Sequence, residues 1–285
     1  MKIQAIIWVI ILIFLLSFII PFASSYEISS NNIIYVDDDN TDGPWEGTKD
    51  HPWQYIQDGI DNASDGDTVY VYSGIYYETL RLNKSITLKG ENKYTTIIDG
   101  RYSGNWSCGI CLSPSSRSLN SQINGFTIHY FDKAITRSSP IGGFLNIDIS
   151  NNIISNNYFG ICVSSTIGGV HISLDIINNI IENNCMGITL SCVRDVLIKR
   201  NHIISNNEVG ISLDSGSFIR IIQNNIFNNN IDAFNNVYSF INSVFLNRWN
   251  NNYWGEDGYK IKIIPGNPYI TIDWRPAQEP YDISI

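Results

Sequence analysis

The chain has 285 residues, of which 44 % are hydrophobic, and a formal net charge of −9. This length accommodates one large domain or two small ones, and the hydrophobic content is sufficient for a continuous core. Phosphate binding requires a basic face, so the acidic balance argues against nucleic acid as a partner. An acidic surface suits solubility or cation binding, and it disfavours polyanionic substrates unless a metal bridges the charges.

The N-terminus consists of Lys2, an almost wholly apolar run over residues 3–20, and small residues at 23–25. This order is typical of a secretory signal, and we expect cleavage after Ser25. The run is also just long enough to span a bilayer, so retention as an N-terminal anchor is the alternative. We therefore predict a signal peptide or anchor over residues 1–25. The protein is expected to be secreted or at the cell surface, with membrane contact only through residues 3–20 if they are retained.

Residues 26–66 are expected to form an N-terminal cap segment. Pro52 fits the first turn of a helix, and Trp53, Ile56 and Ile60 recur at helical spacing on one face. Since a repeat protein needs its open end covered, we predict a short amphipathic helix that caps the stack.

The cap segment also contains Asp38-Asp39-Asn40-Thr41-Asp42-Gly43, which matches the opening of a calcium-binding loop. The twelfth position of that loop is Lys49 in place of the usual Glu, so Glu46 or Asp50 is needed as a substitute ligand. The predicted Ca²⁺ ligands are Asp38, Asn40, Asp42 and Glu46. A plain turn rich in Asp, Asn and Gly is the alternative, and no other cofactor is predicted.

Short alternating strands are expected next, in residues 67–247. The first runs are Thr68–Tyr72, Tyr77–Leu82, Ser85–Gly90 and Thr96–Gly100, and a loop is expected over Ser113–Asn120. From Asn151 onward the pattern Asn-x-Ile-Ile/Phe-x-Asn-Asn-x-x-Gly/Ala-Ile/Phe occurs four times. Its equivalent small residues are Gly160, Gly187, Gly210 and Ala233, at steps of 27, 23 and 23 residues. Such a period indicates one unit stacked on copies of itself, and the short Ile-rich runs leave no room for long helices. The predicted fold class is all-β, a parallel β-helix or single-stranded solenoid.

The repeats predict two kinds of stacked residue. One inward ladder of isoleucines is expected from Ile110, Ile135, Ile161, Ile188 and Ile211. The Asn pairs fall at the turns, where Asn tolerates the left-handed backbone region and stacked amides bond from rung to rung.

Asp148 and Asp175 occupy equivalent positions, each 12 residues before its repeat glycine. Adjacent rungs place them about 5 Å apart on the outside. Two such carboxylates suit a Ca²⁺ site or an acid with a raised pKa, and the cations Lys199, Arg200 and Arg220 follow on later rungs. These five residues are the candidates for a catalytic site, and a solvated face is the alternative interpretation.

Residues 248–285 are rich in aromatic residues and proline, and we expect them to form a C-terminal cap. Aromatic rings also stack on the apolar faces of sugars, so Trp249, Tyr253, Trp254 and Trp274 are candidates for carbohydrate stacking. The alternative is that the rings cover the open end of the stack.

The five cysteines leave at least one thiol unpaired within the chain. Cys111 and Cys162 are two rungs apart, which is too far for a disulfide. Stacking as small side chains is the favoured interpretation, and the CxxC spacing of Cys108 and Cys111 leaves a zinc or redox role open.

Several segments resemble the right-handed parallel β-helix superfamily, which includes pectate-lyase-like and polygalacturonase-like enzymes. The resemblance lies in Val69–Glu78, Lys84–Glu91 and Thr96–Gly100, and in Asn252–Trp254 and Asp273–Ala277 near the end. It covers roughly residues 33–283 and is similar in kind to archaeal and bacterial surface proteins related to periplasmic copper-binding β-helix proteins. The resemblance implies a right-handed parallel β-helix, with the short helix as its N-terminal cap.

Three functions follow from the resemblance and the residues. The leading expectation is an exported, non-catalytic cell-surface protein that binds a polysaccharide, a surface glycan or a protein partner. The alternative is a polysaccharide lyase or glycoside hydrolase, although the sequence motifs of polygalacturonases do not occur in the repeats. The third is a metal-loading accessory protein, for which the four His residues do not share one repeat position.

Overall fold

The computed structural model describes residues 31–113, 118–137, 144–165, 171–236, 247–255, 260–267 and 269–283. From Asn31 onward these residues form one compact unit. The predicted signal peptide or anchor lies outside the described residues. Within them, no helix is long and apolar enough to cross a membrane.

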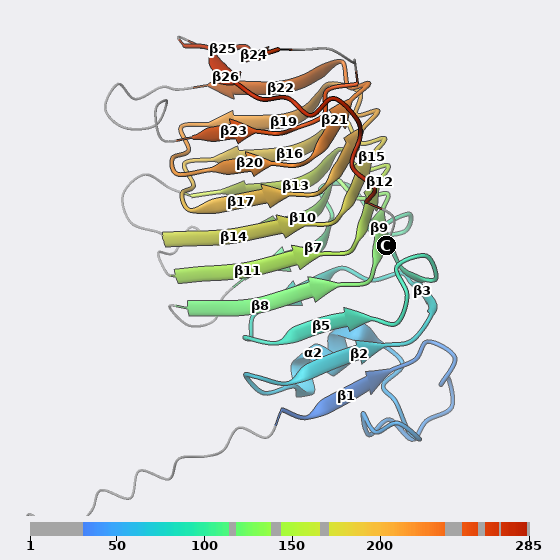
Figure 1. The fold of residues 1–285 in the computed structure, drawn as a ribbon. Coiled ribbons are helices and arrows are strands. Elements are labelled where there is room, and N and C mark those ends of the chain that lie inside the picture. Colours follow the sequence, from blue (N-terminus) through green and yellow to red (C-terminus); the bar gives the residue numbers. More distant parts are fainter. Residues whose placement is uncertain are drawn as a thin grey trace, which may run out of the picture. The chain divides into compact units, whose positions relative to one another are not determined.

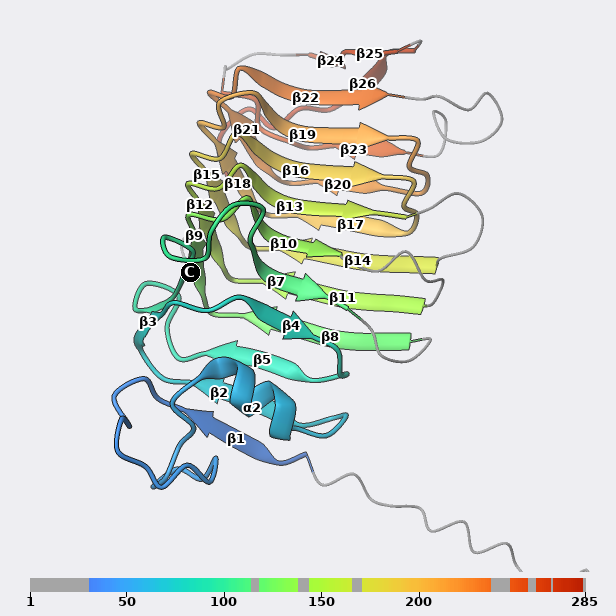
Figure 2. The ribbon, with the colours of Figure 1, turned by 180° about the vertical axis from the view of Figure 1, so that it is seen from behind.

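Three sheets form the walls of the solenoid, and each coil passes through them in the order A, B, C (Figures 1 and 2). Sheet A consists of β1 (Ile33–Val36), β2 (Thr68–Val71), β5 (Thr87–Gly90), β8 (Ser118–Asn124), β11 (Phe144–Ser150), β14 (His171–Ile177), β17 (Val196–Lys199), β20 (Arg220–Ile222), β23 (Arg248–Asn250), β26 (Thr271–Asp273) and β24 (Lys262–Ile264). Sheet B consists of β3 (Gly74–Tyr76), β6 (Thr96–Asp99), β9 (Thr127–His129), β12 (Ile153–Ser155), β15 (Ile180–Glu182), β18 (His202–Ile204) and β21 (Asn225–Phe227). Sheet C consists of β4 (Leu80–Leu82), β7 (Cys108–Leu112), β10 (Lys133–Arg137), β13 (Phe159–Ser164), β16 (Met186–Ser191), β19 (Val209–Asp214), β22 (Ile231–Asn236) and β25 (Gly266–Asn267).

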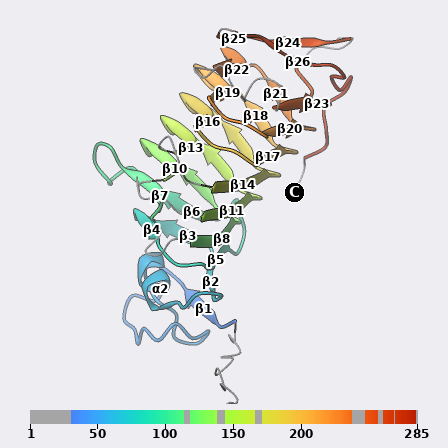
Figure 3. The same cartoon turned by 90° about the vertical axis from the view of Figure 1, so that its left-hand side faces the viewer.

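The pairing confirms the predicted fold, a right-handed parallel β-helix. Neighbouring strands pair in parallel throughout the coils, and Figure 3 shows the stack from the side. The expected loop over residues 113–120 is shorter than predicted, because Ser118, Leu119 and Asn120 already belong to β8 and pair with β11. The first strand of sheet A, β1, lies inside the predicted cap segment and pairs with β2.

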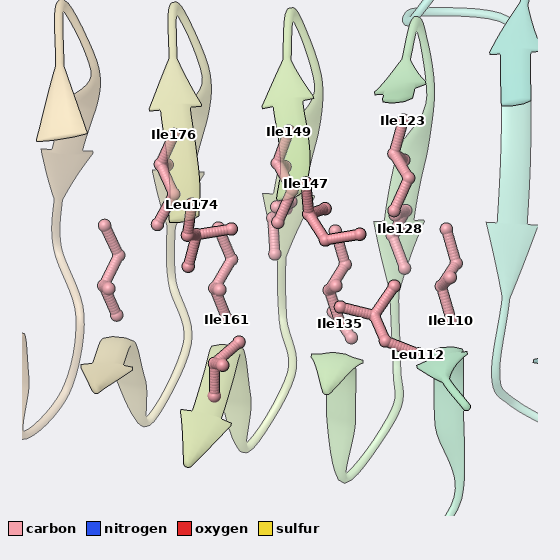
Figure 4. Close-up of a cluster of buried hydrophobic side chains, with 14 of the residues drawn as sticks. Ile110, Leu112, Ile123, Ile128, Ile135, Ile147, Ile149, Ile161, Leu174 and Ile176 are labelled. Carbon is pink, nitrogen blue, oxygen red and sulfur yellow. The ribbon is translucent and has the colours of Figure 1, made fainter. Parts of the chain in front are cut away.

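The predicted isoleucine ladder forms the centre of the core. Ile110, Ile135, Ile161, Ile188 and Ile211 pair in register on successive strands of sheet C, and all are fully buried (Figure 4). At the next rung the predicted repeat alignment is wrong by one residue, because Ala233 pairs with Ile211 and not with Gly210. The connection before β19 has four residues and the connection before β22 has three, so the last coil is shorter. A one-residue shift exchanges the two faces of a strand, and it buries Ala233 while turning Phe234 outward.

Two ladders of buried asparagines run along the corners on either side of sheet B, as the Asn pairs predicted. The first contains Asn152, Asn179, Asn201, Asn224 and Asn252, and the second contains Asn157, Asn184, Asn206 and Asn229. In each step the side-chain amide donates to the amide oxygen of the next rung, at 2.8–3.2 Å. Both ladders end on a carboxylate at their donor end, Asp273 for the first and Asp232 for the second. An anion there complements the aligned amide dipoles.

The cap helix α2 (Ile56–Asn62) lies at the N-terminal end of the stack and begins four residues later than Pro52 predicted (Figure 2). Trp53 instead makes a parallel bridge with Val36, beside β1. The Glu78 carboxylate accepts hydrogen bonds from the backbone N–H groups of Ile56 and Gln57, and so supplies the cap that no side chain at the helix start provides.

Candidate binding groove

The outward side chains of sheet A line one extended surface, which faces the viewer in Figure 1. Along each strand, alternate residues point into the core and out to solvent, as in β8 and β11. Register then places outward residues of successive coils side by side in columns. Three hollows lie on this surface, one after another along the stack.

The first hollow is aromatic, with a volume of about 780 Å³, and lies over β1, β2 and β5. Tyr35, Tyr70 and Tyr72 pack against one another with ring centroids 5.4–6.0 Å apart. The ammonium group of Lys89 lies 5.9 Å from the ring of Tyr70. The sequence did not predict this cluster, because Tyr35 precedes the cap helix and reaches the sheet only through the pairing of β1 with β2.

The second hollow, about 160 Å³, contains the predicted pair of carboxylates. Asp148 and Asp175 are directly in register on β11 and β14, which confirms their predicted stacking. The Oδ1 atom of Asp148 is buried without a hydrogen-bond partner. Burial raises the pKa of Asp175 above its ordinary value, the charge of Asp148 raises it further, and Arg220 opposes both. Two close carboxylates with an orphaned oxygen suit a shared proton or a bound cation.

The third hollow, about 560 Å³, adds the positive charges of Arg220 and Arg248. Arg220 is in the column of Asp175, with Leu197 between them. Lys199 pairs with Ile177 and Ile222 and so lies in the next column. The structure therefore brings Asp148, Asp175 and Arg220 onto one surface and leaves Lys199 beside it.

Arg200 is not part of this surface. Its backbone turns through a left-handed conformation after β17, with φ of 54°, and its guanidinium donates to the backbone oxygen of Asp282 near the C-terminus. The residue contributes to docking of the C-terminal segment, in place of the predicted catalytic role.

The three hollows adjoin one another, because neighbouring hollows share a lining residue. Gln122 lines the first and the second, and Asp175 lines the second and the third. The groove crosses nine strands from β1 to β23, and eight steps of about 4.8 Å give a length of roughly 38 Å. We call this surface the sheet A groove.

Asp38 and Asn40, two of the predicted calcium ligands, form hydrogen bonds with different backbone groups of the protein. The Asp38 carboxylate accepts from the backbone N–H of Ile75, and the Asn40 amide donates to the carbonyl oxygens of Pro44 and Pro52. No group of three or more His, Cys, Asp or Glu side chains that could hold a metal ion occurs in the described parts of the chain. The loop geometry thus fits the turn interpretation better, and the structure adds no support to a metal-loading role.

The aromatic C-terminal residues mostly cover the end of the stack. Trp249 and Trp254 are each 3 % exposed, and their ring centroids are 5.9 Å apart. The prediction of sugar stacking is therefore wrong at these two positions, because the rings have no free face. Tyr253 contacts the ring of Phe227 edge-on, at 5.7 Å. Trp274 is 65 % exposed and remains available for stacking.

The coil also continues further than the predicted cap boundary at residue 248. Arg248, Trp249 and Asn250 pair in register with β20, and the antiparallel pair of β24 and β26 closes the sheet beyond them.

A second polar cluster, absent from our sequence predictions, lies on the outside of sheet B. Asp99 is almost fully buried and binds the guanidinium of Arg101 at 2.7 Å. Burial alone raises the pKa of Asp99, but the bonds and charge of Arg101 outweigh it and hold the pKa below its ordinary value. The Nε2 atom of His129 lies 3.1 Å from Asp99, outside hydrogen-bond geometry. Ser155 follows His129 in register, but makes no hydrogen bond to it, so the column does not form a nucleophile relay.

The structure also pairs two cysteines that we expected to be small stacking residues. Cys108 and Cys111 form a disulfide, while Cys162, Cys185 and Cys192 are free. Cys111, Thr136 and Cys162 are in register, which confirms that Cys111 and Cys162 are two rungs apart. The CxxC spacing was the available signal for the disulfide.

The family comparison agrees with this architecture. A family profile described as right handed beta helix region matches residues 84–252, more than half of the chain. The uncharacterized protein YwoF of Bacillus subtilis is 25 % identical over 164 residues, which are 55 % of this chain and 35 % of YwoF, so the chain spans little more than a third of that relative. The A-module of mannuronan C-5 epimerase AlgE4 from Azotobacter vinelandii aligns over 76 % of this chain and 78 % of the module, with 15 % identity and a TM-score of 0.37.

Proposed function

Because the chain belongs to the right-handed β-helix family, we propose that it is an exported protein whose sheet A groove binds a polysaccharide chain without cleaving it. Solenoids commonly bind ligands on the extended surface that their stacked repeats create. The observation that carries the proposal is the continuity of the groove across nine strands. A linear polymer is the ligand shape that matches a long, open and shallow surface.

The lining supports a sugar ligand in particular. The three tyrosines at one end present rings for the apolar faces of pyranoses. The side-chain amides of Asn120, Gln122 and Asn146 follow in the middle and suit sugar hydroxyls. Arg220 and Arg248 at the far end suit a carboxylate on an acidic sugar, since guanidinium groups bind carboxylates with two parallel hydrogen bonds.

Affinity electrophoresis against acidic and neutral polysaccharides, with and without Ca²⁺, tests the proposal. We expect the full chain to be retarded, and Tyr70→Ala to weaken retardation about tenfold, a loss near 1.4 kcal/mol. Tyr94→Ala is the matched control, because Tyr94 is 57 % exposed but does not line the groove. Equal retardation of the two variants, or none for the unmodified chain, would refute groove binding.

A polysaccharide lyase or hydrolase is the second candidate, and the raised pKa of Asp175 favours it. A carboxyl group with a raised pKa keeps its proton to a higher pH than an ordinary one, which suits general acid catalysis. New reducing ends or unsaturated products that Asp175→Asn abolishes would establish this activity. Retention on the glycan with neither product would leave the non-catalytic function as the better account.

A further inference from the structure

The loop between β6 and β7, residues 100–107, carries the two most exposed large hydrophobic side chains of the described residues. Trp106 is 86 % exposed and Tyr102 is 78 % exposed. Large aromatic side chains left in water lose the stabilisation that burial would bring, and exposed apolar groups that lie together are a feature of binding surfaces.

The backbone of this loop is strained at the same residue. Trp106 has φ of 65°, in the left-handed region that favours glycine and is an outlier for a bulky side chain. Gly104 in the same loop also has a positive φ, of 78°, at no such cost. A strained conformation persists only where the surroundings enforce it, and such residues cluster at ligand sites.

The structure shows what enforces it, because the loop is tied down at both ends. At its start, the Arg101 guanidinium binds the buried carboxylate of Asp99 through Nη2 at 2.7 Å and Nε at 2.9 Å. At its end, the Cys108–Cys111 disulfide follows directly, and the N–H of Lys133 donates to the carbonyl of Ser107 at 3.1 Å. The loop is therefore held in shape before any ligand arrives, which lowers the entropy cost of binding.

A hollow of about 370 Å³ opens beside Trp106. Its lining consists of Gly104, Asn105, Trp106, Ser107, Tyr130 and Asp132. Two ring systems, one carboxylate, one amide and two hydroxyls match the mixed surface of a pyranose, which has an apolar face and a rim of hydroxyl groups.

The charged groups in and beside this hollow determine whether it suits an acidic or a neutral sugar. Asp132 is the ionisable group in the lining, and Arg101 is already bound to Asp99 with its guanidinium 5.6 Å from the ring of Tyr130. An acidic sugar would meet a carboxylate there with no uncommitted cation in the lining, whereas a neutral sugar meets a hydrogen-bond acceptor. This differs from the far end of the sheet A groove, where two arginines lie.

We propose that residues 104–107 with Tyr130 and Asp132 form a second carbohydrate site, specific for a neutral pyranose, in which Trp106 stacks on the sugar ring and Asp132 accepts from its hydroxyls. The site is built from the loop after sheet B and the turn between β9 and β10, so it is separate from the sheet A groove. Its existence does not depend on what the groove binds.

Affinity electrophoresis of the full chain in gels containing xylan, glucomannan or soluble starch tests the site. We expect at least one of these neutral glycans to retard the chain, and Trp106→Ala to weaken that retardation about tenfold or more. Trp106→Phe, which keeps a ring, should restore part of it. Tyr94→Ala is the matched control, since Tyr94 is 57 % exposed and does not line this hollow.

Trp106→Gly separates a binding role from a structural one. Glycine adopts the left-handed φ without strain, so this variant should lose retardation while its thermal midpoint is no lower than that of the unmodified chain. Tyr70→Ala should leave retardation by the Trp106 site intact, so failure here and failure of the groove proposal are distinguishable. Absence of retardation by all three glycans, retardation unchanged by Trp106→Ala, or an equal loss caused by Tyr94→Ala would overturn the proposal.

Discussion

Replacement of one ladder asparagine, Asn201→Leu, should destabilise the protein far more than the size of the change suggests. The Asn201 side chain is fully buried and takes part in five hydrogen bonds. Its oxygen accepts from the backbone N–H and the side-chain amide of Asn179, and its amide donates to Ile176, Lys199 and Asn224. Leucine has a similar volume and makes none of these bonds.

The magnitude follows from which partners are left without a bond. The Asn179 backbone N–H has this one side-chain acceptor and becomes a buried orphan, at a cost of about 1–3 kcal/mol. The other four bonds involve groups that keep further partners, at about 0.5–1 kcal/mol each. Burial of the leucine side chain offsets about 1–2 kcal/mol. The net loss is about 3 kcal/mol, or about 6–12 °C in thermal midpoint for a chain of this size.

Urea unfolding followed by tryptophan fluorescence measures this loss, with the free energy taken from the midpoint and slope. Asn207→Leu is the matched control, because Asn207 is exposed in the same coil and should change stability by less than about 0.5 kcal/mol. A difference below about 1 kcal/mol between the two variants would refute the view that the amide ladder holds the coils in register.

Three further predictions follow. Asp175→Asn should stabilise the protein by less than about 1 kcal/mol above the acid range. The raised pKa of Asp175 means that the stability of the unmodified chain falls as pH rises from about 4 to the pKa in the folded state, and the neutral amide removes this fall. Urea midpoints of the variant that fall with pH as steeply as those of the unmodified chain would contradict this. Gly187→Ala should cost about 1–3 kcal/mol in the same assay, since a Cβ would lie 2.6 Å from the carbonyl oxygen of Gly210, and a neutral effect would mean that the rungs are further apart. Replacement of both Cys108 and Cys111 by Ser should weaken neutral-glycan retardation severalfold while acidic-glycan retardation persists, and an equal loss of both would point to general unfolding.

The repeats predicted the fold and the register of most coils because each coil places chemically distinct residues in fixed columns. Ile161 and Ile188 align in the core, and the carboxylates of Asp148 and Asp175 align outside, from spacing alone. The error at Ala233 shows the limit of this method. One residue fewer in a connection shifts a strand, and Ala and Phe at neighbouring positions gave no contrast strong enough to reveal the shift.

The groove and the Trp106 loop were not predictable by the same means. Tyr35 and Tyr70 are 35 positions apart and belong to no repeat, so only pairing through β1 brings them together. Trp106 lies in an irregular connection, and its exposure depends on how Arg101 and the disulfide hold the backbone. Contacts that depend on one tertiary arrangement leave no periodic trace in a sequence.

The lengths of the connections explain where the Trp106 loop lies. From β8 to β21, every connection from sheet A to sheet B has two residues, and those from sheet B to sheet C have three or four. The asparagine ladders run through these two corners, and the one extra residue there, before β19, follows Asn206 and leaves its amide bonds to Asn184 and Asn229 intact. Between sheets C and A, where no such ladder is present in the described residues, the connections from β7 to β23 vary from four to eleven residues.

The Trp106 loop lies at one of these corners, at a coil where the ladder has not yet begun. It is an eight-residue connection from sheet B to sheet C, between Asp99 and Cys108, and it precedes the first ladder residue at that corner, Asn157. Where the ladder is absent, the corner tolerates a long loop, and there the chain carries a strained and exposed tryptophan. Large variation in connection length is therefore found at the third corner and in the N-terminal coils, and a ligand site built from irregular connections forms in those places.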